Sequence, residues 1–327
     1  MSDQRLNRRT ALGLIGGAAS LMMATPSYAD SFPAGPVRLI VPFPPGGGAD
    51  AMARIIGPKA SQIAGQDFVI ENHGGANGNI GAELVARANP DGYTVLLATA
   101  NWTISESIYK SLPFNVVSDF APVAYLARTP NIIALNPSFP AKSLRDLEAL
   151  AKASPGKINY SSDQGGPLRL GVELLDSDTG MNLMNVPYNG TAAAILGALR
   201  GDVAIVMAPA PAILPYVKSG KLKALAVSSA ERLKLLPDVP TVAESGVPGF
   251  DVNQWYGIVA PAKTPKSAVD ALNGIFIKAL RAPELEGTLR DAILIPVGGS
   301  PQSFADFVRN DVTKWAKVAK AANIPLS

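Results

Sequence analysis

The stretch that most constrains the fold is residues 37–54, where an apolar run breaks into a Pro/Gly loop and restarts as a helix. Val37–Val41 predicts a short buried strand, and three prolines end it because proline lacks the N–H that a strand ladder needs. Asp50 is placed to cap the helix, which leaves the N–H groups of residues 46–49 facing the loop together with the positive end of the helix dipole. Such a helix start can hold an anion, although the same pattern also occurs in plain connections. The glycine spacing fits neither a dinucleotide-binding fingerprint nor a P-loop.

A second strand, glycine loop and helix start follow in the same order along the chain. Residues 67–72 predict a second strand that runs into a glycine loop at 74–79, where Asn77 or Asn79 can cap the next helix. Residues 93–98 predict a third strand. This βαβαβ order implies a parallel sheet, so both glycine loops and residues 99–101 should share one sheet edge. Two helix starts that converge on one edge favour anion binding over a plain connection.

A second set of elements predicts a second domain. Strands are expected at 131–135, 157–160, 183–186, 202–207 and 222–227, with polar loops at 161–167, 187–191 and 208–210. Ser143 and Asp146 resemble a capping box for a helix that ends at Ala153. The second sheet is also expected to be mainly parallel.

The chain is expected to cross into this domain near 128–130 and to return with a strand at 254–261. Three helices, at 266–281, 283–292 and 303–321, complete the first domain, with one more strand near 293–297. The expected fold is therefore α/β, with two domains that each hold a mainly parallel sheet flanked by helices. Domain 1 is residues 30–128 plus 254–327, domain 2 is residues 129–253, and small ligands commonly bind in such interdomain clefts.

The N-terminus predicts export. Residues 1–29 contain Arg8-Arg9, an uncharged run and the small-residue sequence Ser27-Tyr28-Ala29, which is typical of a signal peptide cleaved near Ala29. The segment resembles a twin-arginine signal, but Ala11 replaces the usual Phe, so Tat and Sec export both stay open. The mature chain is therefore expected to be exported. Removing this leader leaves 26 basic and 25 acidic residues, a near-neutral chain that argues against nucleic acid as a partner.

The amino-acid composition excludes several kinds of catalytic and metal site. The chain has no cysteine and one histidine, His73, so thiol nucleophiles, thiolate metal sites and iron–sulfur clusters are excluded. There is no G-x-S-x-G elbow, no H-E-x-x-H and no tight Asp/Glu cluster, so no metal, cofactor or catalytic residue is expected. The alternative is an exported α/β enzyme, a hydrolase or lyase that uses Asp50, Asp163 or Glu173. Reversible binding without chemistry is the preferred interpretation.

Five motifs in order then resemble a known family, the tripartite tricarboxylate transporter receptors, also called the Bordetella uptake gene family. They are Val41–Asp50 (VPFPPGGGAD), Glu71–Asn72 with Gly75–Gly81 (GANGNIG), Asn89–Thr94 (NPDGYT), Val186–Gly190 (VPYNG) and Trp255–Gly257 (WYG). The resemblance covers nearly all of the mature chain. It implies a periplasmic solute-binding protein with the fold of a two-domain periplasmic binding protein of the type II-like, Venus flytrap kind, so the expected location is the periplasm. The protein is expected to be a monomer and to hand a small carboxylate to the membrane components of a tripartite tricarboxylate-type transporter. The ligand would be a dicarboxylate, a tricarboxylate, an acidic amino acid or an aromatic acid, and a sensory module would need the same cleft.

The resemblance also implies ligand-binding residues in the loops of both domains. Those of domain 1 would hold a carboxylate through backbone N–H groups: Pro45, Gly46, Gly47, Gly48, Ala49, Gly75, Ala76, Asn77, Gly78 and Asn79, with Thr99 and Asn101 as weaker candidates. Those of domain 2 would set specificity: Ser161, Ser162, Gly165, Gly166, Tyr188, Asn189 and Gly190.

Two positions depart from the family pattern. His73-Gly74 stands where the family usually has Arg-Pro, and Arg169-Leu170 stands where it usually has His-Leu. Arg169 is therefore a candidate for a bidentate contact with a second carboxylate, or else a solvated arginine in the first turn of a helix. Asp163 is similarly either a turn former or an acceptor for a ligand hydroxyl or amine. Closure is expected to hinge near 128–130 and 252–254.

Overall fold

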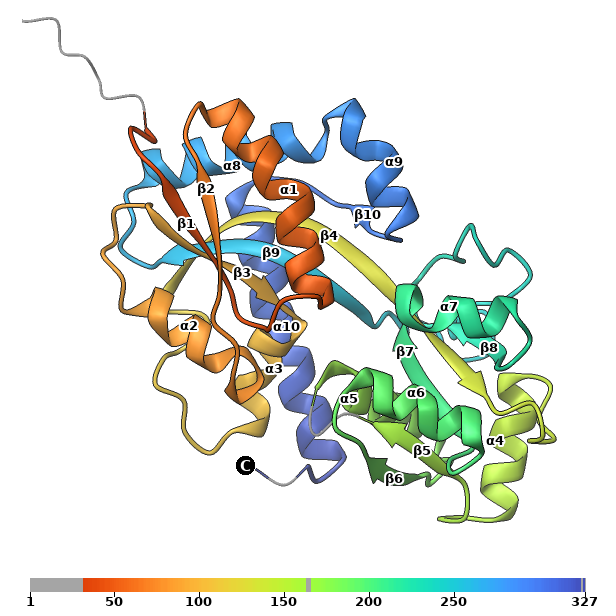
Figure 1. Cartoon of the computed structure of the whole chain (residues 1–327). Helices are drawn as coiled ribbons and strands as arrows, with labels where there is room; N and C mark the ends of the chain where they lie inside the picture. Colours follow the sequence, from red (N-terminus) through yellow and green to blue (C-terminus); the bar gives the residue numbers. More distant parts are fainter. Residues whose placement is uncertain (1–31, 163–165, 325, 327) are drawn as a thin grey trace, which may run out of the picture.

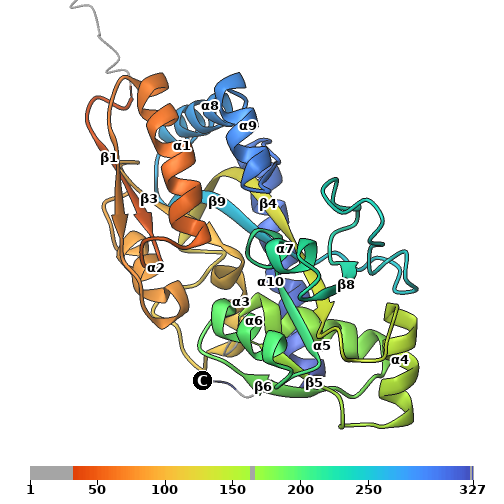
Figure 2. The same cartoon turned by 45° about the vertical axis from the view of Figure 1, so that its right-hand side comes forward.

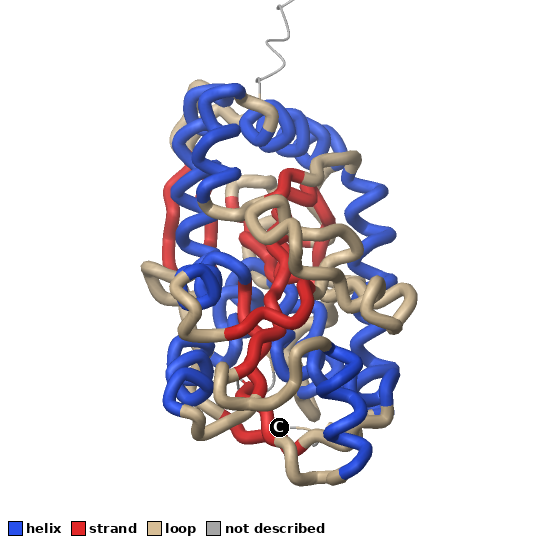
Figure 3. The backbone as a smooth tube through the Cα atoms, turned by 90° about the vertical axis from the view of Figure 1, so that its right-hand side faces the viewer, coloured by secondary structure: helices blue, strands red, loops and turns tan. Residues whose placement is uncertain are grey.

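The computed structural model describes residues 32–162, 166–324 and 326, which form two α/β lobes joined by long strands (Figure 1). The strands hydrogen-bond in the order β2-β1-β3-β9-β4-β7-β5-β6, and β8 and β10 pair separately with β4. Helices flank this curled sheet on both sides (Figure 3). The predicted leader at 1–29 lies outside the described residues.

Lobe 1 has the predicted strand order at its edge. β1 (Val37–Val41) pairs in parallel with β2 (Phe68–Asn72) and β3 (Thr94–Thr99). β9 (Asn253–Pro261) then runs antiparallel to β3, so the sheet becomes mixed. The helices of this lobe are α1 (Gly48–Ala64), a short 3₁₀ turn η1 (Ala76–Gly78), α2 (Asn79–Ala86), α3 (Ala100–Ile108), α8 (Lys266–Leu280) and α9 (Pro283–Asp291).

Lobe 2 repeats the α/β pattern. β5 (Asn159–Ser162) pairs in parallel with β6 (Met184–Pro187) and β7 (Ile205–Pro209), whereas β7 and β8 (Lys223–Val227) pair antiparallel with β4. Its helices are α4 (Leu144–Ala153), α5 (Pro167–Thr179), α6 (Thr191–Arg200) and α7 (Ala210–Lys218). The predicted capping box is present, since the Ser143 hydroxyl accepts the N–H of Asp146 at 3.1 Å.

The structure differs from the predictions made from the sequence in two places in this part of the chain. Residues 208–210 are not a loop, because β7 continues to Pro209 and α7 begins at Ala210. The region expected to cross between the lobes, 128–130, was given no secondary structure from the sequence. It lies within β4 (Phe120–Leu135), a strand of 16 residues whose first half, 120–127, was not predicted. Pro122 and Pro130 obscured this strand, whose register against β9 shifts twice.

The C-terminal helix α10 (Pro301–Ala321) links both cores. Phe304 and Val308, near its start, belong to one core cluster with Trp255 of β9, whereas Trp315 and Val318 belong to a second core cluster with apolar residues of α3 and α5. The helix therefore spans both lobes along one side of the molecule (Figure 2). The short strand β10 (Ile295–Pro296), predicted near this region, pairs with β4. Within the described residues, no helix is long and apolar enough to cross a membrane.

Candidate ligand-binding cleft

A cleft of about 1140 Å³ lies between the lobes, where the start of α1 faces the starts of α5, α6 and α7. The strands β4 and β9 form its floor through Thr129, Gln254 and Tyr256. Other described residues on its walls come from the two predicted loop edges: Pro45, Gly46, Gly47, Gly48, Ala49, Asn77, Thr99, Asn101, Tyr188, Asn189 and Gly190.

The start of α1 offers unpaired backbone donors. Gly47 is the N-cap, and no side chain caps the helix. Among the described residues, the N–H groups of Gly47, Gly48 and Ala49 have no acceptor in the protein. Because these groups also lie at the positive end of the α1 dipole, they can receive an anionic oxygen.

Asp50 has a different role from the one predicted. It lies in the first turn of α1 and does not cap it, and its carboxylate accepts the N–H of Gly46 at 3.0 Å, the Arg54 Nε–H at 2.8 Å and the Asn72 amide at 3.0 Å. The bond from Arg54, followed by that from Gly46, lowers the pKa of Asp50 to about 2. The predicted donor set is therefore one smaller, because the N–H of Gly46 is already used.

The second glycine loop packs on the first. A Cβ at Gly74 would lie 2.8 Å from the Pro44 ring, and one at Gly81 would lie 2.9 Å from Pro42, so both positions need glycine for this close approach. Asn77 has a positive φ of 57°, and its Oδ1 accepts the Asn101 amide at 2.7 Å. Asn77 and Asn101 thus reach the cleft as a hydrogen-bonded pair.

Four predicted residues of this loop, Gly75, Ala76, Gly78 and Asn79, are not among the lining residues. The expectation that Asn77 or Asn79 caps α2 is wrong, since Gly78 holds the N-cap position without a side-chain cap. Asn79 is instead buried, and its Oδ1 accepts the Ser105 hydroxyl at 2.9 Å.

Two buried hydroxyl groups on the cleft wall have no partner. Thr99, at the end of β3, and Thr129, in β4, are each 1% exposed, and both line the cleft. Within the described part of the chain, neither Oγ1 atom makes a hydrogen bond. Buried polar atoms are almost always paired, so each hydroxyl is available to a ligand or a water molecule in the cleft.

The predicted residues around α5 have other positions. Ser161 and Ser162 are buried in β5, and the Ser162 hydroxyl donates to Asn185 Oδ1 at 2.6 Å. Gly166 is the N-cap of α5. Arg169 does not line the cleft, and its Nε lies 3.5 Å from Glu173 Oε1. Gly165 and Asp163 lie outside the described residues.

Sequence reasoning missed most of the apolar wall in lobe 2. Pro209 ends β7, and Pro211 and Tyr216 lie in α7, so the carboxyl-end rule for parallel strands could have indicated this wall once α7 was recognised. Leu196 of α6 and Tyr256 of β9 carry no local signal. A Cβ at Gly48 would lie 2.5 Å from the Tyr256 hydroxyl, which shows how closely the first loop packs on the floor.

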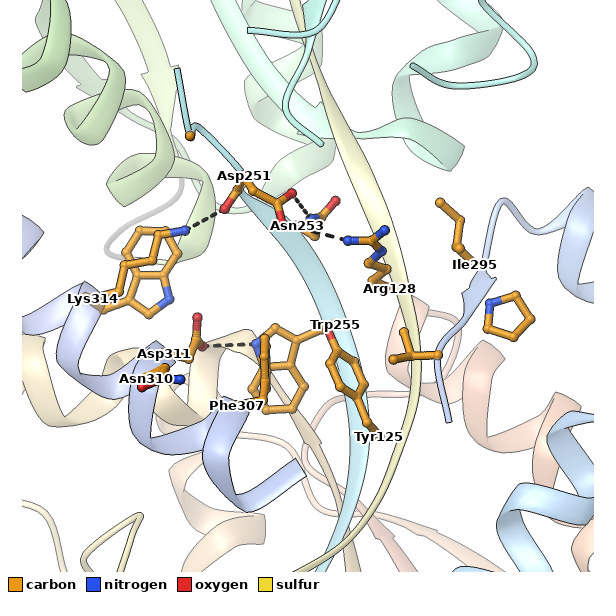
Figure 4. Close-up of a pocket in the computed structure, with 14 residues that line it drawn as sticks. Tyr125, Arg128, Asp251, Asn253, Trp255, Ile295, Phe307, Asn310, Asp311 and Lys314 are labelled. Atoms are coloured by element: carbon orange, nitrogen blue, oxygen red, sulfur yellow. Dashed lines mark hydrogen bonds and ion pairs between the residues drawn. The ribbon is translucent and has the colours of Figure 1, made fainter. Parts of the chain in front are cut away.

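A second cavity, of about 680 Å³, lies on the other face of the two crossing strands (Figure 4). Alternation along the strands explains this placement, since Arg128 and Trp255 point into this cavity while their neighbours Thr129 and Tyr256 point into the cleft. Lys314 Nζ donates to the Asp251 backbone oxygen at 2.5 Å, and Arg128 lies 3.7 Å from the Asp251 carboxylate. These charges connect α10 to both crossing strands.

Asp311 of α10 is buried beside this cavity. Its Oδ2 accepts the Thr103 hydroxyl at 2.6 Å and the Trp255 indole N–H at 3.1 Å. Burial raises the pKa of Asp311 and lowers the pKa of Lys314, one turn further along the helix. The Asp311 carboxylate is hydrogen-bonded to side chains of α3 and β9, and it therefore forms part of the packing between α3, α10 and β9.

The described residues offer no metal site, and their one histidine lies away from the cleft. No cluster of three or more His, Asp or Glu side chains could hold a metal ion there. His73 is not on the cleft wall, and its Nε2 lies 3.2 Å from Glu71. Arg38 holds the pKa of Glu71 at about 2, with His73 adding to the effect.

Comparison with known proteins identifies the family. The model of the tripartite tricarboxylate transporter family receptor matches residues 52–324. The chain belongs to this family. It is 33% identical over 325 residues to Protein BugT of Bordetella pertussis, covering 98% of this chain and 100% of BugT. The relatives confirm the resemblance to the Bordetella uptake gene family.

Solved structures share the fold and identify ligands for the relatives. R. palustris Rpa4515 with adipate has a TM-score of 0.79 and 35% identity, covering 90% of this chain and 100% of that one. MatC of Rhodopseudomonas palustris with bound malate has a TM-score of 0.75 and 30% identity, covering 88% of this chain and 99% of that one. A solved periplasmic transporter has a TM-score of 0.79 and 37% identity, covering 90% and 100%. The fold is thus that of a periplasmic binding protein, and the chain is a solute-binding transport receptor whose homologues imply a periplasmic location.

Proposed function

We propose that this protein captures a small carboxylate in the interdomain cleft and delivers it to the membrane components of a tripartite tricarboxylate-type transporter. The observation that carries the proposal is the start of α1, where three N–H groups without acceptors in the described protein face a cleft between two lobes. Relatives with adipate and malate support the same ligand chemistry.

The carboxylate is proposed to bind across Gly47, Gly48 and Ala49. A charge-assisted hydrogen bond to a carboxylate is worth about 1.5–3 kcal/mol, and the dipole of α1 adds to this attraction. The side chains of Thr99, Asn77 and Asn101 line the same part of the cleft and are proposed to complete the site. Neutral donors suit a receptor that must release its ligand again.

Closure is proposed to bend β4 and β9 where they cross between the lobes. Pro130 pairs with Asn253 and Thr129 with Gln254 at this point, so the bend would move lobe 2 over the start of α1. The bend is proposed to mark the domain boundaries expected from the sequence, at 128–129 and 253–254. We also propose that the protein is exported through a signal peptide cleaved near Ala29 and that it acts as a monomer.

A thermal-shift screen against a panel of organic acids tests this function. The mature protein is expected to show a raised Tm with at least one small carboxylate and no loss of that acid on overnight incubation. Conversion of the acid would favour the enzyme alternative, although the family and its solved relatives are solute-binding receptors. An absence of any shift across dicarboxylates, tricarboxylates, acidic amino acids and aromatic acids, with the fold intact, would contradict the proposal.

A further inference from the structure

The second cavity, here the hinge cavity, lies behind the two strands that are proposed to bend on closure. Thr129 and Tyr256 point from these strands into the cleft, whereas Arg128 and Trp255 point into the hinge cavity (Figure 4). When strands bend toward one face, groups on that face approach each other and groups on the opposite face separate. Closing the cleft must therefore widen the hinge cavity.

The walls of the hinge cavity come from both lobes. Lobe 1 contributes β10, which pairs with β4, and lobe 2 contributes Asp251. Asp251 is fixed to lobe 2, since its Oδ1 accepts the N–H of Ala230 at 3.1 Å. The next residue, Val252, donates its N–H to the backbone oxygen of Ser228 at 2.9 Å. A contact between Asp251 and an element of lobe 1 thus joins the two lobes behind the hinge.

Lys314 of α10 makes the stronger of two such contacts. Its ammonium group donates to the backbone oxygen of Asp251 at 2.5 Å, and a hydrogen bond from a charged donor is a strong one. This part of α10 is held to lobe 1, because Asp311, one turn earlier, accepts the hydroxyl of Thr103 in α3 at 2.6 Å. Closure would pull Asp251 away from Lys314, while α5 slides along the last turns of α10.

Arg128 makes the weaker contact. It pairs with Ile295 of β10 in the sheet of lobe 1, and its guanidinium group lies 3.7 Å from the Asp251 carboxylate. The two side chains are 28% and 41% exposed, so this ion pair contributes little on its own. It nevertheless joins the same two walls as Lys314, and closure would separate it too.

Resting on the function and the closure proposed above, we propose that the contacts of Lys314 and Arg128 with Asp251 hold the empty cleft open and thereby lower its affinity. The cleft is open to solvent in this structure, since Gly47 and Gly48 on its wall are exposed. When only the closed form holds the ligand firmly, the apparent affinity is reduced by the fraction of empty protein that is closed. Lys314 and Arg128 are therefore positioning residues that set affinity without touching the ligand.

Pulsed EPR distances in the empty mature protein test the inference without any ligand. The chain has no cysteine, so Lys218→Cys on α7 and Glu286→Cys on α9 put two spin labels at exposed positions of helices that border the cleft from opposite lobes (Figure 1). In this background, Lys314→Met removes the donor and should shift the distances to shorter values. Lys314→Arg, which keeps a cationic donor, should restore the wild-type distances. Unchanged distances in Lys314→Met, with its circular dichroism intact, would overturn the inference.

A bulky residue in the hinge cavity should shift the same balance without removing a contact. Val297 lines the cavity and is 44% exposed, so Val297→Trp should fold. Its indole ring needs space that the closed form provides, and the distances between the labels should again shorten. The matched control is Val117→Trp, at a valine that is 42% exposed and lines neither cavity, which should leave the distances unchanged. Unchanged or longer distances in Val297→Trp would show that the cavity does not widen on closure.

Ligand affinity gives the second readout, by isothermal titration with malate, adipate, glutamate and benzoate. Lys314→Met and Val297→Trp should each bind the acids that the wild type binds roughly tenfold more tightly. The factor should be the same for each of these acids, because neither residue lines the cleft. Unchanged or weaker binding would overturn the inference and leave the carboxylate-binding function standing. If the wild type binds no acid, the proposed function fails, and the distances in the empty protein still decide the inference.

Discussion

Replacing Gly47 by leucine should abolish ligand binding while the protein remains folded. Gly47 has φ −86° and ψ 175°, which any L-residue can adopt, and the nearest atom to a Cβ there is the Pro44 oxygen at 3.9 Å. The new side chain therefore has room, and it projects from an exposed position on the cleft wall. As an N-cap, leucine is worse than glycine, so a stability cost of up to about 1 kcal/mol is expected.

The loss of affinity follows from the donors that the leucine covers. If two of the three N–H groups no longer reach the carboxylate, about 3–6 kcal/mol of binding free energy is lost, from about 1.5–3 kcal/mol for each charge-assisted bond. At about 1.4 kcal/mol for each factor of ten, the affinity should fall by roughly 10² to 10⁴. Isothermal titration with the acid that gives the largest thermal shift measures this change.

The matched control is Gly274→Leu. Gly274 lies in α8, away from the cleft, and a Cβ there meets no atom within 4 Å. This variant should bind the acid as the wild type does. If Gly47→Leu retains affinity within threefold of the control, the start of α1 is a plain connection and the reasoning fails.

Three further predictions concern stability. Gly48→Ala should destabilise the protein by about 1–3 kcal/mol, because its Cβ would overlap the buried Tyr256 hydroxyl, and urea unfolding should show a much smaller loss for Gly47→Ala. Asp50 has a depressed pKa of about 2, so its pairing stabilises the protein above its unfolded pKa of about 3.9 and is lost as the pH falls toward 2; the stability gap to Asp50→Asn should shrink from pH 7 to pH 3, and a constant gap would refute this. Asp311 has a raised pKa, so the sign reverses: as the pH rises above about 4, the wild type should lose stability relative to Asp311→Asn, and a gain would contradict it.

Much of the fold could be predicted because it depends on local patterns. β1, β2 and β3 are apolar runs that end in glycine or polar loops, and their order along the chain implies the parallel pairing that the structure shows. The start of α4 was predicted from two residues, Ser143 and Asp146. The first half of β4 and the helix α7 were not predicted, because prolines at 122, 209, 211 and 215 suggested breaks where tertiary packing sustains regular structure.

The candidate site was predicted in part for the same reason. The backbone donors of the first loop follow from its glycines and the helix behind it, and Tyr188, Asn189 and Gly190 follow from a loop after a parallel strand. The cap position was missed because helix α1 begins at Gly48, which places Asp50 inside the first turn. The apolar wall depends on which side of α6 and α7 faces the other lobe, and no local pattern specifies that.

The most direct test of the central claim is a ¹⁵N–¹H NMR titration of the mature protein with the acid that raises its Tm. The backbone amides of Gly47, Gly48 and Ala49 are predicted to show the largest shifts, moving downfield as they donate to the carboxylate. Large shifts confined to residues around the second cavity, such as Asp251 and Asp311, with these three amides unchanged, would contradict a carboxylate site at the start of α1.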